Sequence, residues 1–443
     1  MTKPEHNTTA AKSAQAKKLK GKITVPGDKS ISHRSLMLSA IALGKAKIKG
    51  LLEGEDIIAT ANALRSMGVN IQKDVDIWHV TGVGVGGLHA PKTVLDMGNS
   101  GTGARLMMGL VSSYNFNTFF TGDASLLKRP MSRVITPLEK MGAQFTTSEG
   151  GRLPLAVIGN NNLIPIIYEL PMASAQVKSA ILLAGLNTAG ITTIVESEAT
   201  RDHTELMLKA LGAEIKVMDQ NGKKHISIKG YPQLKTVDID VPADPSSAAF
   251  LIVAAIITPN SEITITNVCI NPHRTGLYIT LQEMGADIKF HNKKIVAGEE
   301  VADITAKSSQ LNGIKIPASR APSMIDEYPI LAIAASCAKG ETSMQGLAEL
   351  KVKESNRLQA IADGLTGNGV KFEIGNDSLT IYGGIVKGGG NVKTHMDHRI
   401  AMSFLIMGLI SENSISVDDI SMINTSFPNF TQLMNEIGAN ITT

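Results

Sequence analysis

The sequence is poor in cysteine: Cys269 and Cys337 are the only two in 443 residues, and neither belongs to a Cys-x-x-Cys or Cys/His spacing. A disulfide framework or a structural zinc site is therefore not expected. Aromatic residues make up only 4%, and the net charge is +3. Both values argue against nucleic-acid binding, which needs a basic surface and stacking side chains. Small anionic ligands fit better, because they need only a local cluster of cations.

Long hydrophobic runs are also missing. The longest, Ala248–Ile257 and Ile400–Ile410, fall short of the roughly 20 residues that a membrane-spanning helix needs. The first residues are polar and lysine-rich, without the apolar segment of a signal peptide. We therefore expect residues 1–17 to form a flexible tail on a cytoplasmic protein. With 43% hydrophobic residues, the remainder is expected to fold into two or three globular domains.

One sequence phrase occurs six times, at intervals of 69 to 84 residues. Each copy reads as the last turn of a helix, a Gly that ends the helix in the left-handed conformation, and an apolar strand. A second helix start precedes each copy by about 33 to 42 residues. The pattern predicts six α/β modules, which divide naturally into two domains of three. The copies are LRSMGVNI from Leu64, LEKMGAQF from Leu138, LKALGAEI from Leu208, LQEMGADI from Leu281, LTGNGVKF from Leu365 and MNEIGANI from Met434.

Several of the predicted helix starts combine a small or hydroxyl residue with a cation. A cation there is unfavourable for the helix dipole, so its recurrence needs a reason. Taken singly, each Lys or Arg is more often a solvated surface charge. Recurrence at equivalent places favours a shared site for a polyanion, since helix starts also offer unsatisfied amides. The positions are Lys29-Ser30 with Arg34, Ser100-Gly101-Thr102 with Arg105, Ser174 with Gln176 and Lys178, Lys128-Arg129-Pro130, Arg201-Asp202-His203, Lys353 to Arg357, and Asp397-His398-Arg399.

Two carboxylates stand close to these cations. Asp326 lies at a Ser-Met-Ile-Asp helix start, and Glu354 lies between Lys353 and Arg357. Acid–base chemistry uses carboxylates that neighbouring charges tune. Each carboxylate also has a purely structural explanation, as a helix N-terminal charge for Asp326 and as an i to i+3 ion pair with Arg357 for Glu354. Taken alone, each carboxylate is better explained by its structural role.

Two glycine-rich segments differ in what they predict. The run Gly98–Gly103, before a helix start, would let the backbone approach a phosphate or carboxylate closely. The run Gly82–Gly87 formally matches GxGxxG, but Pro91 and the lack of a following amphipathic helix favour a loop. No GxxxxGK[ST] motif occurs. His395 and His398 lack further ligands nearby, so no metal site is expected.

Six motifs in order, PGDKSISHR, GNSGTGARL, Lys128-Arg129-Pro130, SAQVKSA, VKESNRL and DHRIAMSF, together resemble the 5-enolpyruvylshikimate-3-phosphate (EPSP) synthase family from about residue 20 to about residue 430. The resemblance implies a two-domain inverse α/β barrel of six βαβαββ units, three per domain, whose helix N-termini converge on a cleft that closes on substrate. We expect residues 18–26 and 244–443 to form domain 1 and residues 27–243 to form domain 2.

The resemblance also implies a reaction. Family members transfer the enolpyruvyl group of phosphoenolpyruvate to the 5-hydroxyl of shikimate 3-phosphate, and release phosphate through a tetrahedral intermediate. They do so without a metal or organic cofactor, in the shikimate pathway to chorismate and the aromatic amino acids. The expected partners are these two small molecules only, with no nucleic acid and no membrane, and the chain is expected to be a monomer. Glyphosate is the family's known inhibitor.

Residue roles follow from the same resemblance. The catalytic residues would be Asp326 as proton acceptor for the attacking hydroxyl, Glu354 for proton transfer at the phosphoenolpyruvate methylene, and Lys29. Shikimate 3-phosphate would meet Lys29, Ser30, Arg34, Ser174, Gln176, Arg201, Asp326 and Lys353. Phosphoenolpyruvate would meet Lys29, Gly101, Arg129, Gln176, Arg357 and Arg399.

The sequence departs from many family members at two places. The run Thr425–Pro428 lacks a Lys that often precedes it, so the phosphoenolpyruvate site has one cation fewer. Arg201 stands where many members have a Tyr and would add charge on the shikimate side. Both differences resemble the second, more divergent class of the family. Because Gly101 leaves space beside the phosphoenolpyruvate site, glyphosate should bind and Gly101→Ala should weaken it.

Three alternatives stay open. The sister enzyme, which transfers enolpyruvate to UDP-N-acetylglucosamine, usually carries a Cys in a mobile loop of its first domain, and no Cys occurs between Met1 and Val268 here. A catalytically silent repeat protein would not need the recurring cations with Asp326 and Glu354. An RNA-phosphate-processing relative is opposed by the low aromatic content.

Overall fold

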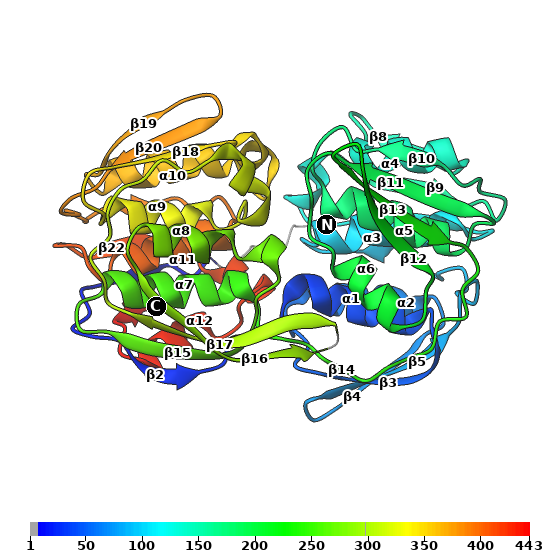
Figure 1. Cartoon of the computed structure of the whole chain (residues 1–443), viewed down its shortest axis with the longest axis horizontal. Helices are drawn as coiled ribbons and strands as arrows, with labels where there is room; N and C mark the ends of the chain where they lie inside the picture. Colours follow the sequence, from blue (N-terminus) through cyan, green and yellow to red (C-terminus); the bar gives the residue numbers. More distant parts are fainter. Residues whose placement is uncertain (1–7, 297) are drawn as a thin grey trace. The chain divides into compact units, whose positions relative to one another are not determined.

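The computed structural model describes residues 8–296 and 298–443, which fall into two compact units (Figure 1). Unit 1 comprises the chain up to Pro26, Ala243–Lys294 and Glu300–Thr443, whereas unit 2 comprises Gly27–Pro242 and Ile295–Glu299. Each unit combines strands with helices, which confirms the predicted α/β class. The closure into an inverse barrel and the expected domain boundaries stay predictions.

Unit 2 contains, within its described residues, three four-stranded sheets of one design. In each sheet the first two strands in spatial order are parallel, and the other neighbours are antiparallel. The spatial orders are β14 (Ile239–Asp240), β3 (Leu43–Lys49), β5 (Ile77–Val83), β4 (Asn70–Asp74); β6 (Leu95–Asp96), β7 (Asn117–Thr121), β9 (Arg152–Ile158), β8 (Gln144–Ser148); and β10 (Ile167–Glu169), β11 (Ile191–Glu196), β13 (Lys223–Lys229), β12 (Ile215–Gln220).

Unit 1 repeats this design with two variations, again counting only what the structure describes. One of its three sheets has three strands, and the first and last sheets each take a strand from the beginning of the chain. The spatial orders are β2 (Lys20–Ile23), β15 (Glu262–Cys269), β17 (Glu299–Lys307), β16 (Asp287–Val296); β18 (Glu341–Gln345), β20 (Ser378–Tyr382), β19 (Lys371–Ile374); and β21 (Asn391–Val392), β22 (Ile415–Val417), β1 (Ala11–Ser13), β23 (Ile441–Thr442).

Two helices accompany each sheet, so the six predicted modules are confirmed. In three modules, those of the second and third sheets of unit 2 and of the last sheet of unit 1, the first helix lies between two parallel strands in chain order, as expected for a crossover connection. The first helices are α1 (Lys29–Ala40), α3 (Gly101–Ser112), α5 (Ala175–Leu186), α7 (Pro245–Ile257), α9 (Tyr328–Ser336) and α11 (His398–Met407), and the second helices are α2 (Glu55–Ser66), α4 (Ser132–Met141), α6 (His203–Ala210), α8 (Gly276–Glu283), α10 (Arg357–Gly367) and α12 (Phe430–Glu436).

The expected flexible tail is wrong for residues 8–17, because this segment contains β1. Ala11 pairs with Val417 of β22, and Lys12 pairs with Thr442 of β23. The side chains of Ala11 and Ser13 are buried, and the strand satisfies backbone groups of β22 and β23 that would otherwise lie at sheet edges. Residues 1–7 of the expected tail lie outside the described residues.

The six repeated glycines end helices as predicted. Their φ angles lie between +73° and +108°, the left-handed region in which only Gly avoids a steric penalty. Each is followed by a strand, as the phrase predicts. The Gly82–Gly87 run occupies the end of β5 and the turn after it, so the expected loop begins two residues later, at Gly84.

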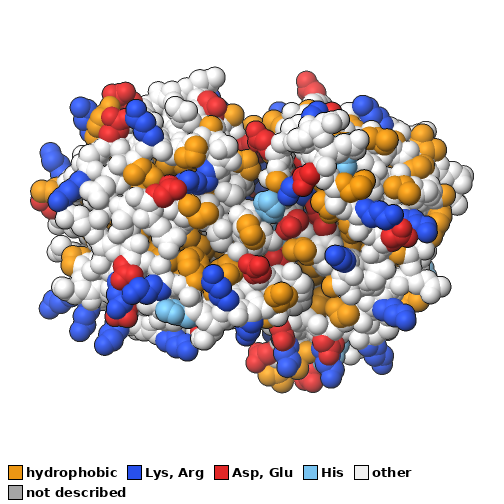
Figure 2. Space-filling view, in the orientation of Figure 1, with side chains coloured by type: hydrophobic (Ala, Val, Ile, Leu, Met, Phe, Trp, Pro, Cys, Tyr) orange, Lys and Arg blue, Asp and Glu red, His pale blue; other side chains and the backbone are white. Residues whose placement is uncertain are grey.

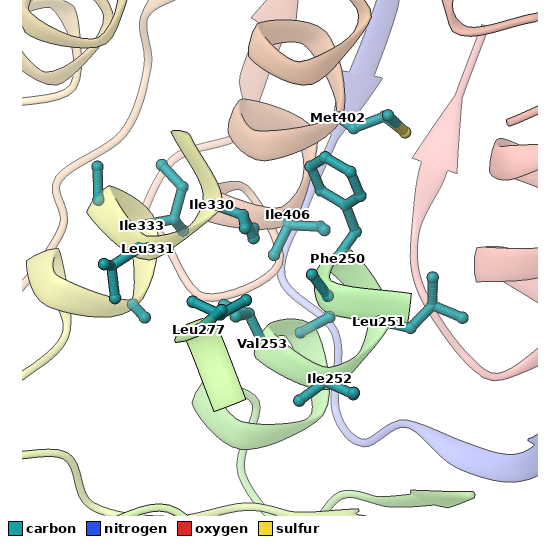
Figure 3. Packing of buried hydrophobic residues seen from close by; sticks show 14 of the residues in the cluster. Phe250, Leu251, Ile252, Val253, Leu277, Ile330, Leu331, Ile333, Met402 and Ile406 are labelled. Carbon is teal, nitrogen blue, oxygen red and sulfur yellow. The ribbon is translucent and has the colours of Figure 1, made fainter. Parts of the chain in front are cut away.

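The first helices are buried on nearly all sides. In α7, twelve of thirteen residues are buried, and such a helix must be covered on every face. Figure 3 shows its Phe250 and Val253 among side chains of neighbouring helices, including Leu277 of α8, Ile330 of α9 and Ile406 of α11. Each such side chain contributes about 1.5–3 kcal/mol through burial. This packing fixes the first helices, whose N-termini carry the candidate site residues.

Charge is not segregated on the viewed face of either unit, where Figure 2 shows basic and acidic side chains interspersed. That face therefore carries no extended patch of positive charge that could attract a large polyanion. None of the helices in the described residues is long and apolar enough to cross a bilayer.

Candidate active site

In unit 2, a glutamine links the starts of two first helices. Gln176 in α5 donates from Nε2 to Thr102 Oγ1 in α3 (2.9 Å). Its Oε1 accepts from Arg105 Nη1 (2.9 Å). Farther along the same helices, a Cβ on Gly109 of α3 would lie 2.2 Å from the Ala180 carbonyl oxygen of α5. The two contacts occur in the same order along both helices, so α3 and α5 run parallel and their N-termini lie together.

Arg34 is a buried cation that hydrogen-bonds to neutral groups. Its Nε donates to Thr204 Oγ1 and its Nη2 to Ser179 Oγ, both at 2.7 Å, and its Nη1 donates to the Ser30 carbonyl (2.9 Å). Burial, partly offset by the negative charge of Glu205, lowers the pKa of Arg34 to about 10. The guanidinium is therefore still charged at neutral pH, and it favours an anion nearby.

Gly101 opens α3 between two guanidinium groups. A Cβ at this position would lie 3.0 Å from Arg129 Nη1 and 3.1 Å from Arg105 Nη1. Arg129 is held by Asn99 Oδ1 (2.6 Å) and Ser125 Oγ (3.0 Å). An anion at this helix start would meet two cations as well as backbone N–H groups. The sequence pattern placed Arg105 at this helix start, but the predicted site did not include it.

The start of α1 presents Lys29. Asp28 caps this helix, since its Oδ1 accepts from the Ile31 amide (2.8 Å). Lys29 itself forms an ion pair with Asp56 of α2, a partner that the sequence pattern did not indicate. Arg201 lies half-buried in the irregular segment before α6, and Ser174 caps α5.

Lys178 has a structural role rather than the ligand-binding role suggested by its place near a helix start. Its side chain is fully buried, and its Nζ lies 2.7 Å from Glu205 Oε1 and 3.2 Å from Glu196 Oε1. A buried ammonium group with two carboxylates is compensated internally. Lys178 is therefore not a cation available to a substrate.

In unit 1, Arg357 lies at the centre of three carboxylates. The distances from its guanidinium are 2.8 Å to Asp397 Oδ2, 3.2 Å to Asp326 Oδ1 and 2.5 Å to Glu354 Oε2. Burial alone would lower the pKa of Arg357, but these carboxylates outweigh it and raise the pKa. Burial would also raise the pKa of Asp397, yet the charge of Arg357 prevails and lowers it. Arg357 and Asp397 are thus both charged at neutral pH.

Asp326 is half-buried two residues before α9, next to a second cation. Lys353 Nζ lies 3.4 Å from Asp326 Oδ1, the same oxygen that Arg357 contacts. The predicted catalytic carboxylates Asp326 and Glu354 are therefore brought to one guanidinium, within unit 1. Two nearby cations stabilise negative charge on Asp326, as a proton acceptor requires.

Arg399 is anchored beside the same turn. Its Nη1 donates to the Asp326 carbonyl (2.9 Å) and lies 3.4 Å from Glu327 Oε1. Glu327 is buried and also accepts from the hydroxyl of Ser246, at the start of α7. The starts of α7, α9 and α11 are thereby connected through one carboxylate.

Asp397 and Glu327 are functional candidates that sequence reasoning missed. Asp397 directly precedes α11 and reads as an ordinary helix cap, which it also is, since its Oδ1 accepts from the Arg399 amide (3.0 Å). Nothing in the sequence indicated that it also holds Arg357. Thr425, at the position near a missing Lys, is buried and donates to the Met422 carbonyl (2.7 Å).

The fold is shared with solved enolpyruvyl transferases. EPSP synthase from Acinetobacter baumannii matches with a TM-score of 0.87 and 47% identity, over 98% of this chain and 99% of that chain. The enolpyruvyl transferase NikO from Streptomyces tendae matches with a TM-score of 0.77 over 98% of both chains. At 16% identity, the second match shows the fold alone.

The sequence comparisons are more specific. The family model of EPSP synthase (3-phosphoshikimate 1-carboxyvinyltransferase) matches residues 13–434. Proteins named 3-phosphoshikimate 1-carboxyvinyltransferase are similar along their whole length: that of Parvibaculum lavamentivorans is 55% identical over 99% of this chain and 98% of its own, and that of Chelativorans sp. is 57% identical over 97% of both. The chain therefore belongs to the EPSP synthase family, which confirms the resemblance seen in the sequence.

Proposed function

We propose that the chain transfers the enolpyruvyl group of phosphoenolpyruvate to the 5-hydroxyl of shikimate 3-phosphate, as a step of the shikimate pathway to chorismate and the aromatic amino acids. Phosphate leaves through a tetrahedral addition–elimination intermediate. Family membership and the names of the relatives support this reaction. The observation that carries the catalytic assignment is the Asp326 carboxylate, which lies next to Lys353 and Arg357.

Asp326 and Glu354 divide the proton transfers between them. Asp326 removes the proton of the attacking hydroxyl, because its neighbouring cations keep it ionised until the substrate arrives. Glu354 serves proton transfer at the methylene carbon of phosphoenolpyruvate. Its contact with Arg357 at 2.5 Å fixes its position relative to Asp326. Lys29 contributes positive charge to the developing transition state.

The remaining residues bind the two substrates through charge-assisted hydrogen bonds. Both substrates are polyanions, which explains why cations recur at the helix starts. The chemistry uses side chains only, without a metal or cofactor. Shikimate 3-phosphate is bound by Lys29, Ser30, Arg34, Ser174, Gln176, Arg201, Asp326 and Lys353, and phosphoenolpyruvate by Lys29, Gly101, Arg129, Gln176, Arg357 and Arg399.

The same proposal includes where and how the chain works. It acts in the cytoplasm, as a monomer, on small molecules, and without nucleic acid or membrane partners. The near-balanced charge of +3 and the 4% aromatic content support small anionic substrates over a nucleic acid. Sedimentation of the purified chain tests the monomer, which a concentration-dependent larger species would contradict.

Phosphate release from phosphoenolpyruvate tests the reaction. The purified chain is incubated with phosphoenolpyruvate and shikimate 3-phosphate, with phosphoenolpyruvate and UDP-N-acetylglucosamine, and with phosphoenolpyruvate alone. We expect release only with shikimate 3-phosphate, and we expect Asp326→Asn to lower kcat by about 10²- to 10⁴-fold, the usual contribution of a general base. Asp363→Asn, an exposed carboxylate in α10, is the matched control and should retain parental activity.

Each other outcome contradicts a defined part of the proposal. Release with the nucleotide sugar only would assign the chain to the sister activity. No release with either acceptor would contradict the transferase reaction altogether. Full activity of Asp326→Asn would leave the reaction in place and remove Asp326 as the base.

A further inference from the structure

His33 in unit 2 is a fully buried histidine for which the proposed reaction gives no role. It lies one turn after Lys29 in α1. Its Nδ1 is 2.8 Å from Thr60 Oγ1 in α2, and its Nε2 is 3.3 Å from Ser100 Oγ, the N-cap of α3. One imidazole thus connects three helices, two of which begin with predicted substrate-binding residues.

The hydrogen bonds around His33 have a defined direction. The hydroxyl of Thr60 donates to the Asp56 carbonyl (3.2 Å), so Thr60 Oγ1 accepts from Nδ1–H. The other ring nitrogen, Nε2, is then bare and accepts from the Ser100 hydroxyl. The Ser100 oxygen in turn accepts from the Gly103 amide (3.0 Å). Each donor hydrogen in this series of hydrogen bonds has one acceptor, and the imidazole is neutral.

The charges near the ring favour the same protonation state. Burial, followed by the positive charges of Lys29 and Arg34, lowers the pKa of His33 well below 6.5, and Asp28 opposes this only in part. A protonated ring could not accept from Ser100, so the bridge requires the neutral form.

The bridge also explains the third glycine of the Gly98–Gly103 run. A Cβ on Gly103 would lie 2.7 Å from Ser100 Oγ and 2.9 Å from Thr60 Oγ1. A side chain would therefore displace the two hydroxyl groups that His33 joins. Gly103 serves the connection between α2 and α3, whereas Gly101, two residues earlier, faces the guanidinium groups of Arg129 and Arg105.

We propose that His33 is a positioning residue for phosphoenolpyruvate: by bridging Thr60 and Ser100, it sets the start of α3, with Gly101, relative to Lys29 at the start of α1. This inference rests on the proposed function, because Lys29 and Gly101 are assigned to phosphoenolpyruvate there. His33 itself touches no substrate. Its loss should therefore weaken the use of phosphoenolpyruvate more than that of shikimate 3-phosphate, and should leave kcat largely intact.

Two substitutions separate the two hydrogen bonds. In His33→Asn, the short amide can still reach Thr60 but not Ser100. In His33→Gln, the longer amide reaches the position of Nε2 and can rejoin Ser100. We expect His33→Asn to raise the KM for phosphoenolpyruvate about tenfold, the equivalent of one buried hydrogen bond. We expect His33→Gln to stay within threefold of the parent, and the KM for shikimate 3-phosphate to change less than twofold in both.

A double-mutant cycle with Ser100→Ala tests whether the two residues act as a unit. Ser100→Ala alone should raise the KM for phosphoenolpyruvate, and adding His33→Asn should raise it no further. Ser39→Ala is the matched control, because Ser39 is buried in the same helix and its hydroxyl has no hydrogen-bond partner among the described residues. It should leave both KM values unchanged.

The unmodified chain is assayed first. If it released no phosphate with shikimate 3-phosphate, the proposed function would fail, and this inference with it. If it is active, three results would each overturn the role of His33 and leave the proposed function in place. These are a parental KM for phosphoenolpyruvate in folded His33→Asn, an equal rise of the KM values for both substrates, and independent effects of the two substitutions in the cycle.

Discussion

The two units hold their arginines in different ways. Within the part of unit 2 that the structure describes, Arg34 and Arg129 hydrogen-bond only to hydroxyl, amide and carbonyl groups. In unit 1, Arg357 and Arg399 contact carboxylates. Two lysines of unit 2 differ from these arginines, since Lys29 pairs with Asp56 and Lys178 pairs with Glu196 and Glu205.

This difference separates two uses of the same side chain. A guanidinium with neutral partners keeps its charge for an incoming anion, as those of Arg34 and Arg129 in unit 2 do. A guanidinium among carboxylates mainly fixes their positions, and its removal leaves buried negative charge without a partner. Substituting an arginine should thus impair binding in unit 2 and folding in unit 1.

The largest expected effect is that of Arg357→Gln. Asp397 is fully buried and would lose its principal cation, so the free energy of unfolding should fall by about 3–5 kcal/mol. Urea unfolding followed by circular dichroism measures this loss. Arg399→Gln is the control in the same cluster and should cost less, because Arg399 is partly exposed and more distant from its carboxylate. If the free energy of unfolding fell by less than about 1 kcal/mol in Arg357→Gln, the arginines of the two units would not differ in the way described.

Arg129→Gln is the counterpart in unit 2. Losing its charge-assisted contacts with substrate should raise the KM for phosphoenolpyruvate about 100-fold, since a hydrogen bond to a charged group contributes roughly 1.5–3 kcal/mol. The free energy of unfolding should change by less than about 1 kcal/mol, because only neutral partners are left behind. Steady-state kinetics and urea unfolding are measured on the same preparation. A stable variant with an unchanged KM would remove Arg129 from the phosphoenolpyruvate site.

Gly101→Ala should have a smaller effect, and one that depends on Arg129. The added Cβ would lie 3.0 Å from Arg129 Nη1, so the flexible end of the arginine must shift. We expect the glyphosate concentration for half inhibition to rise about tenfold, or about 1.4 kcal/mol. In an Arg129→Gln background, the same substitution should add little. Gly367→Ala in unit 1 is the control, because a Cβ at that position would meet open space.

The smallest expected effect is the pH dependence that His33 adds to unit 2. Its pKa is lowered on folding, mainly by burial and then by Lys29 and Arg34, so the unfolded chain binds the proton more readily. Stability due to this group is therefore complete above about pH 6.5 and is lost as the pH falls below that value, by at most about 1.4 kcal/mol per pH unit. Asp28 and Asp56 are the carboxylates near this end of α1.

The comparison of the parent with His33→Asn isolates this contribution, since the other titrating groups are common to both. The difference between their free energies of unfolding should shrink by about 1 kcal/mol between pH 7.5 and pH 5.5. A difference that is constant with pH would show that His33 is not held neutral in the folded state.

The modules could be predicted because their signal is local. A Gly that ends a helix in the left-handed conformation depends on its own backbone, and all six repeated glycines adopt it. The strand β1 could not be predicted, because its partners lie about 400 residues later in the chain. A strand of only three residues is also too short to show an alternating hydrophobic pattern in the sequence.

The site was predictable to a similar extent. The cations could be located because their recurrence at helix starts can be recognised in the sequence alone. Their partners Asp397, Glu327 and Asp56 could not, since each stands where an acidic residue is common for capping or dipole reasons. Which carboxylate meets which arginine depends on the packing of neighbouring helices, and that requires the folded structure.

The position of β1 between β22 and β23 also bears on how the protein is made. The main segment of unit 2, Gly27–Pro242, is continuous, so it can fold while the ribosome is still extending the chain. The last sheet of unit 1 joins β1 with β22 and β23, which are synthesised about 400 residues later. Until those strands emerge, β1 has no edge to pair with, and the nascent chain carries it unpaired. Unit 2 can therefore mature before unit 1 is completed.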